Sequence, residues 1–178
     1  NPVTVVHLES GSCLEMETVQ IEGVDSTKRV TKADLKDDAR LVIKEKIMTS
    51  GSQYAETEFS VDMNGKGCSA DISSRSVAKG DSKQKFISVI NGNNECAGHS
   101  ECDAIIMENA CVKAVPEITA NDVNASLIHE AAIGKIAGEQ ITKLMTLGLS
   151  QKEAEEQIVK GFLKESVFYF IAFKIYSE

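Results

Sequence analysis

The chain has 178 residues and a net charge of −8, with 42% apolar and 26% charged residues. This size and composition are typical of one compact globular domain and exclude a disordered chain. The acidic balance, with 5% aromatic residues and no Trp, also argues against a nucleic-acid-binding protein, which needs a basic surface.

Residues 3–132 carry the period of β-strands. In FSVDM at 59–63, for example, alternate residues are apolar and would share one face of a strand. Turn residues follow apolar segments in MNG at 63–65, ING at 90–92 and MEN at 107–109. These turns are unevenly spaced, roughly 17 to 27 residues apart. The pattern therefore predicts either a β-solenoid with a loose repeat or a β-sandwich.

The pattern changes to helix after Gly134. A first helix has apolar residues at 141, 144 and 145 and ends before Gly148, a typical left-handed cap. SQKE at 150–153 is a capping box that opens a second helix. Residues 131–178 hold six Lys and six Glu, so the negative excess lies before them. We therefore expect a mainly β core at 1–132 and a helical subdomain at 133–178.

The chain has no apolar run of the roughly 18–20 residues that a membrane span needs. We expect a soluble, cytoplasmic protein, and five cysteines, an odd number, favour reduced thiols over a disulfide framework. The apolar stretch 167–176, interrupted by Lys174, either docks on a partner or completes the core. Since the chain begins with Asn-Pro, we expect that an N-terminal portion is missing.

One group of candidate metal ligands is the segment CAGHSEC at 96–102. It places the thiols of Cys96 and Cys102 and the imidazole of His99 within seven residues, which suits a soft metal. In an extended strand the two cysteines share a face and His99 points away, so joint ligation requires a turn near Gly98. The alternative is that each cysteine is a small buried core residue.

A second candidate is the pair His129-Glu130, which follows an apolar segment just before the change to helix. Adjacent residues of a strand face opposite ways, so only one of the pair would enter a shared site. The alternative is a solvated, charged strand end.

Two common catalytic motifs do not occur in the sequence. It has no Gly-x4-Gly-Lys-Ser/Thr phosphate loop and no Gly-x-Ser-x-Gly nucleophile elbow. These absences argue against a P-loop ATPase and an α/β-hydrolase.

Several segments, taken in order, resemble the SufB/SufD proteins of iron–sulfur cluster assembly, in particular short archaeal members. The segments are ARLVIKEKIMT at 39–49, YAETEF at 54–59, SRSVAKG at 74–80, ECDAIIM at 101–107, VPEI at 115–118, HEA at 129–131, GLSQKEA at 148–154 and IVKGF at 158–162. The resemblance implies a parallel β-helix followed by a helical subdomain, which favours the solenoid over the sandwich.

The resemblance also implies a function. A member of this family is expected to be a scaffold rather than an enzyme, holding a transient Fe–S cluster. It is expected to dimerise with itself or a SufB/SufD-type subunit, to bind a SufC-like ABC ATPase, and to meet sulfur donors and cluster acceptors. By position, Cys102 corresponds to the cysteine used in cluster formation and His129-Glu130 to the His-Glu-Ala motif. Glu130 favours a SufB-like role because SufD-type subunits usually lack it.

A scaffold must release the cluster that it builds. One thiolate from Cys102, with Glu130 or His129, is expected to hold a cluster less tightly than four thiolates. Two alternatives stay open. One is a SufD-like structural subunit without a cluster, and the other is a zinc module using Cys96, His99 and Cys102.

Overall fold

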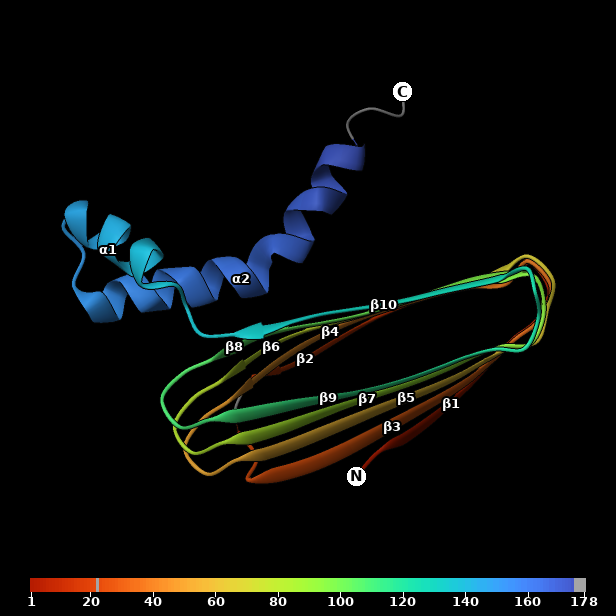
Figure 1. The fold of residues 1–178 in the computed structure, drawn as a ribbon, viewed down its shortest axis with the longest axis horizontal. Coiled ribbons are helices and arrows are strands. Elements are labelled where there is room, and N and C mark those ends of the chain that lie inside the picture. The colour runs from red at the N-terminus through yellow and green to blue at the C-terminus, as the bar shows by residue number, and fades with distance from the viewer. Residues whose placement is uncertain (22, 175–178) are drawn as a thin grey trace. The chain divides into compact units, whose positions relative to one another are not determined.

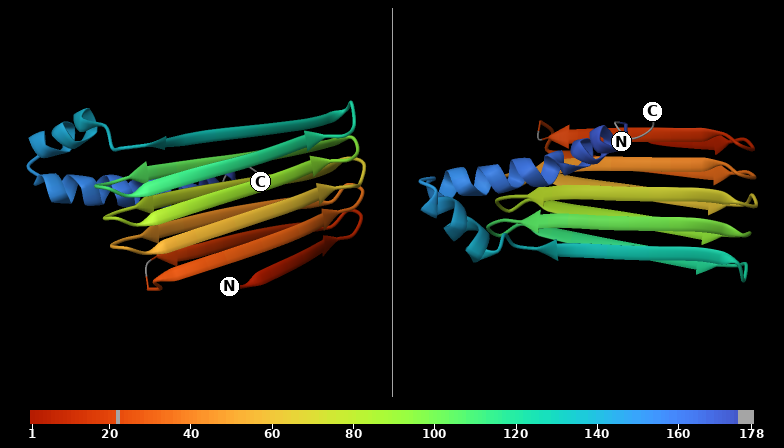
Figure 2. Two further views of the ribbon diagram at one scale, coloured as in Figure 1. Left: turned by 60° about the horizontal axis from the view of Figure 1, so that its bottom comes forward. Right: turned by 90° about the horizontal axis from the view of Figure 1, so that it is seen from above.

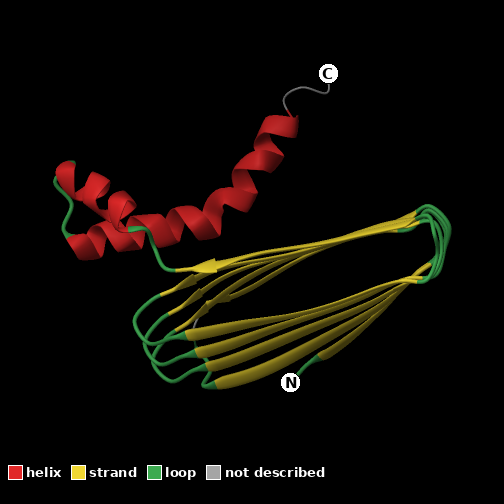
Figure 3. Cartoon of the chain, viewed as in Figure 1, coloured by secondary structure: helices red, strands yellow, loops and turns green. Residues whose placement is uncertain are grey.

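The computed structural model describes residues 1–21 and 23–174, with the backbone alone for 165–174. Contacts within the chain divide it into two compact units, residues 1–133 and 134–178. The first unit holds strands and the second two helices, as the colours of Figure 3 show. The expected fold class, a mainly β solenoid followed by helices, is confirmed.

The strands of the first unit form two parallel sheets, and the chain alternates between them (Figure 1). The odd sheet contains β1 (Val3–Leu8), β3 (Ser26–Leu35), β5 (Tyr54–Met63), β7 (Lys83–Gly92) and β9 (Cys111–Ala120). The even sheet contains β2 (Cys13–Ile21), β4 (Arg40–Thr49), β6 (Cys68–Ala78), β8 (Cys96–Ile106) and β10 (Ala125–Gly134). Because each strand pairs in parallel with the strand two places along the chain, the fold is a β-solenoid and not a sandwich.

Successive coils stack in chain order, as the colours in Figure 2 show. Val3 pairs with Val30 and Tyr54 with Lys83, and the strand registers from β1 to β9 correspond to coils of 27 to 29 residues. The repeat is therefore regular, and the expectation of an irregular one is wrong. Of the three expected turns, the one at 90–92 is also wrong, because these residues end strand β7.

Side-chain amides reinforce the stacking at one turn. Asn121 donates to Asn93 at 2.7 Å, Asn93 donates to Asn64 at 2.7 Å, and Asn64 donates to Asp34 at 2.6 Å. We call this set the amide ladder. It links four successive coils, so each coil aligns the next. The three asparagines are equivalent, since each directly follows its odd strand, whereas Asp34 is the register partner of Asp62, two residues before Asn64.

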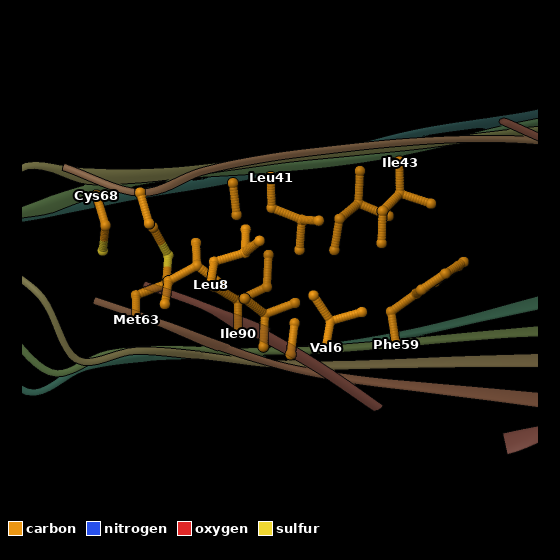
Figure 4. Close-up of a cluster of buried hydrophobic side chains, with 14 of the residues drawn as sticks. Val6, Leu8, Leu41, Ile43, Phe59, Met63, Cys68 and Ile90 are labelled. Atoms are coloured by element: carbon orange, nitrogen blue, oxygen red, sulfur yellow. The ribbon is translucent and has the colours of Figure 1, made fainter. Parts of the chain in front are cut away.

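The interior between the sheets has two chemically different halves. The apolar half, near the ends of the odd strands, buries Leu8, Leu35, Leu41, Ile43, Met63, Ile72 and Ile90 (Figure 4). The polar half, near the ends of the even strands, buries Glu45, Thr49, Thr57, Ser74, Ser76, Ser82 and Gln84. Inward-facing side chains alternate with outward-facing ones along each strand, so position along the strand decides which half a residue enters.

The second unit contains α1 (Gly138–Thr146) and α2 (Gln151–Lys174). Gly148 has a φ of 94°, as a left-handed cap requires. The expected capping box forms, because Ser150 N–H donates to Glu153 Oε2 at 2.8 Å and Glu153 N–H donates to Ser150 Oγ at 3.3 Å. The expected docking of the 167–176 side chains lies outside the described residues. No helix within the described ranges is long and apolar enough to cross a bilayer.

Candidate functional site

Cys102 lies in the interior of the solenoid. It is on the inner face of β8, with 1% of its surface exposed, and it packs on the edge of the apolar cluster. Its register neighbour on β6 is Ser74, and the neighbour of Ser74 on β4 is Glu45. Cys102 therefore stands at the border between the apolar and polar halves.

Burial raises the pKa of the Cys102 thiol to about 12, and the negative charges of Asp103, Glu45 and Glu101 add to the effect. At neutral pH this thiol is protonated. In the closed solenoid it is neither accessible nor nucleophilic.

Glu45 is the centre of a polar network beside Cys102. Its fully buried carboxylate accepts hydrogen bonds from Arg29 Nη1 at 3.0 Å, Thr57 Oγ1 at 3.0 Å and Ser74 Oγ at 2.9 Å. Arg29 Nη2 also donates to Gln20 Oε1 at 3.0 Å. Burial raises the pKa of Glu45, while the hydrogen bonds and the charge of Arg29 oppose the rise. The network joins strands of both sheets.

A small cavity of about 10 Å³ adjoins this network, lined in part by Glu45, Ser74 and Gln84. A space of this size holds about one water molecule. The polar half is therefore closely packed around its hydrogen bonds.

His129 lies on β10 in the inward-facing phase and is half-buried. Burial lowers the pKa of its imidazole, and the backbone of Ser100 opposes that change. His129 Nδ1 is buried without a hydrogen-bond partner. Ser100 is two residues from Cys102 on the same face of β8, about 7 Å along the strand. Cys102 and His129 thus belong to one interior region.

Glu130 faces the opposite way. Its side chain is 68% exposed, and its Oε2 lies 3.7 Å from His99 Nε2 on the outer face of the even sheet. His99 Nδ1 lies 3.0 Å from Asp71 Oδ1, and this contact raises the His99 pKa. The expectation that the side chains of His129 and Glu130 face opposite ways is confirmed. The strands bring Glu130 to His99 and keep it away from Cys102.

The three proposed zinc ligands do not converge. β8 is continuous from Cys96 to Ile106, without the turn that joint ligation requires. Cys96 and Cys102 lie six residues apart on the inner face, about 20 Å along the strand, and His99 is on the outer face. Within the described residues, no group of three or more His, Cys, Asp or Glu side chains is placed to hold a metal ion.

Sequence reasoning missed Ser74 and Glu45 as neighbours of Cys102, and Arg29 as the partner of Glu45. A signal was present, because Glu45, Ser74 and Cys102 lie 29 and 28 residues apart. Once the coil length is known, equal spacing places these residues in one row of the even sheet.

Comparison with known proteins identifies the relatives of this chain. Residues 2–162 match the family model described as the SufBD core domain of SUF system FeS cluster assembly. A protein of Archaeoglobus fulgidus, named an iron–sulfur cluster assembly SufBD family protein, is 31% identical over 164 residues, covering 92% of this chain and 44% of the relative.

Two further relatives match a smaller part of this chain. A SufBD family protein of Methanocaldococcus jannaschii is 38% identical over 104 residues, covering 58% of this chain and 33% of the relative. The iron–sulfur cluster assembly protein SufB of Bacillus subtilis is 34% identical over 100 residues, covering 54% and 22%. The chain spans less than half the length of each of these relatives.

Proposed function

Because the chain belongs to the SufBD core domain family, we propose that it is part of a cytoplasmic scaffold on which iron–sulfur clusters are assembled. One observation carries the proposal most directly. The buried, unpartnered Nδ1 of His129 lies in the same interior region as the Cys102 thiol. A thiolate and an imidazole nitrogen are both ligands of iron in such clusters.

Cys102 has the role of sulfur acceptor in this proposal. Its thiolate attacks the outer sulfur of a donor persulfide, the donor's S–S bond breaks, and the donor thiolate leaves and takes up a proton. The product is a Cys102 persulfide, formed without any other oxidant. Because burial holds the pKa of Cys102 near 12, the reaction requires a state in which this thiol meets water or a cation.

Strand β10 supports a route to that state. It is the terminal strand of the even sheet, hydrogen-bonded to β8 alone. Displacement of β10 would uncover the edge of β8 and the interior beside Cys102, and it would free Glu130 from its outward position. A separate ABC-type ATPase, binding one arrangement more tightly, would shift the population toward the open one. The dimer partner, a second copy or a SufB/SufD-type subunit, would then complete the site.

The test is anaerobic reconstitution of the full chain with ferrous iron and sulfide, with and without a SufC-like ATPase and ATP. We expect visible sulfide-to-iron charge-transfer absorption in the wild type and the loss of most of it in Cys102→Ser. His129→Ala should weaken the cluster absorption, and Glu130→Gln should reduce it only under conditions that open the site.

Cys111→Ser is the matched control, because Cys111 is an exposed thiol on β9. It should reconstitute like the wild type. A Cys102→Ser variant that acquires a normal cluster would contradict the proposal.

A second candidate is a SufD-like structural subunit that binds the ATPase without carrying a cluster. The observation that favours it is the 1% exposure of Cys102. This candidate predicts ATPase binding with no cluster absorption in any variant. The zinc module lacks comparable support, since its three ligands lie apart on β8.

A further inference from the structure

Two other thiols lie side by side at the far end of the apolar half. Cys68 and Cys96 are the first residues of β6 and β8, and they are register partners. They are 1% and 6% exposed, and both belong to the hydrophobic cluster. Neighbouring strands lie about 4.8 Å apart, so the two side chains enter the interior in parallel.

A third sulfur atom, that of Met63, enters the same end of the apolar cluster from the odd sheet. Met63 is the register partner of Gly92 at the end of β7. A Cβ built on Gly92 would lie 3.1 Å from Cys96 Sγ, and one built on Gly98 would lie 3.2 Å from Met63 Sδ. Figure 4 shows Cys68 and Met63 entering from opposite sheets at one end of the cluster. Because Gly92 and Gly98 have no side chains, the sulfur atoms of Cys96 and Met63 can lie close to their backbones.

The pair also has a route to solvent. A hollow of about 270 Å³ on the surface is lined by both cysteines together with Gly67, Ser69, Glu95, Ala97 and Asn124. An ion can therefore come close to the two cysteine residues from this surface, at the turns that precede β6 and β8, without disturbing Cys102.

The ligand set selects the ion. Two thiolates and a thioether are soft ligands, which favour Cu(I). Structural Zn²⁺ takes four ligands in a tetrahedron, and no fourth donor of the usual kind is grouped here in the described residues. A soft monovalent ion accepts two or three sulfur ligands and adds little charge to an apolar site.

From this geometry we propose that Cys68, Cys96 and Met63 form a binding site for one Cu(I) ion. Binding forms two Cu–S thiolate bonds and releases two protons to solvent, and copper stays in the cuprous state. The site is separate from Cys102, so it does not depend on the proposed scaffold function.

The test is an anaerobic titration of the full, reduced chain with Cu(I) in competition with bathocuproine disulfonate. We expect one Cu(I) per chain held against the chelator. Cys68→Ser and Cys96→Ser should each abolish this retention. Met63→Leu, which conserves volume, should weaken binding without abolishing it and should remove one sulfur from the coordination sphere measured by X-ray absorption.

Three single variants serve as controls, and each should retain copper. Cys13→Ser and Cys111→Ser remove exposed thiols, and Cys102→Ser removes the thiol of the proposed scaffold site. Retention by Cys68→Ser, or its loss in Cys102→Ser, would overturn the proposal. If the serine variants fail to fold, the X-ray absorption spectrum of the copper-loaded wild type tests the proposal. Copper bound mainly by nitrogen or oxygen would contradict the assignment.

Discussion

The two halves of the solenoid interior are built on different physical terms. In the apolar half, side chains such as Leu35 and Ile72 are fully buried and contribute by leaving water. In the polar half, Glu45 and Ser74 are equally buried but make directional bonds. A buried polar group stabilises only while its partners are present. The apolar half should therefore tolerate substitutions that change the shape of a side chain. The polar half should tolerate a substitution only when the hydrogen-bond partners of the residue are replaced with it.

Both halves of the interior affect the Cys102 thiol. The apolar cluster shields it from water, and the row through Ser74 connects it with the charge of Glu45. Both influences raise its pKa. A thiol at such a border stays protonated while it is buried, and the proposed scaffold function would require it to become exposed before it reacts.

The largest expected effect comes from breaking the polar half at its centre. Glu45→Ala leaves Arg29, Thr57 and Ser74 without their common acceptor. Loss of one member of a buried ion pair costs about 3–5 kcal/mol, and we expect a decrease of about 4 kcal/mol in the free energy of unfolding. Urea denaturation measures it.

A double variant tests the cause of that loss of stability. Replacing both Glu45 and Arg29 with Met removes the two charges together, and most of the lost stability should return. A double variant as unstable as Glu45→Ala would show that the unpaired charge of Arg29 is not the reason for the loss.

The matching change in the apolar half is Leu35→Ala, which leaves a cavity. We expect a loss of about 3 kcal/mol, within the usual range for buried Leu. Leu35→Met should cost less than about 1.5 kcal/mol because it conserves volume. Unfolding measurements on both variants check the contrast, and equal losses would contradict the cavity explanation.

A smaller effect is expected where one hydrogen bond joins the sheets. Ser100 Oγ donates to Ser88 Oγ at 2.8 Å, and both residues are buried. Ser88→Ala should cost about 1–2 kcal/mol because the Ser100 hydroxyl loses its acceptor. The double variant with Ser100→Ala should be no worse than the single one, as denaturation midpoints would show. Additive losses would argue against coupling between the two hydroxyls.

The smallest effect belongs to the outer face, where water screens the contacts. Asp71 raises the His99 pKa above its ordinary value of 6.5. The resulting stability is fully present below that value and is lost as the pH rises through the higher folded pKa. With the His99 side chain 36% exposed, we expect well under 1 kcal/mol. Asp71→Asn should weaken this pH dependence, and a smaller part should remain because Glu101 and Glu130 also raise the His99 pKa. Unfolding measured across pH 5 to about 8 tests it.

Local signals predicted local structure well. Alternation in 59–63 placed a strand within β5, and the SQKE box at 150–153 placed the start of α2. Both depend on neighbouring residues alone. The parallel coil, by contrast, came from resemblance, because pairing partners 28 residues apart leave no trace in a short window.

The polar half explains why the alternation of apolar and polar residues did not reveal the length of a coil. On β6 the inward Ser74 and Ser76 and the outward Ser73 and Arg75 are all polar, so alternation disappears where the interior is polar. The turn at 79–82 held a clue. Gly51, Gly80 and Glu108 all have positive φ values, at spacings of 29 and 28 residues, but Glu is an unusual residue there.

For the candidate site, the sequence put Cys96 and Cys102 on one face of a strand with His99 on the other, and separated His129 from Glu130 by simple alternation. It could not place His99 beside Glu130, because that contact depends on the pairing of β8 with β10. It could not reveal the burial of Cys102 either, since burial depends on the facing sheet.

The amide ladder has a polarity. Each asparagine donates toward the N-terminal coil, and the series ends on the carboxylate of Asp34, which when ionised can only accept. A single carboxylate thus sets the orientation of three amides above it. Asp34→Asn would keep the shape of the ladder but abolish its direction, since an amide can face either way. The direction of the hydrogen bond at one coil therefore fixes the direction of the hydrogen bond at the next.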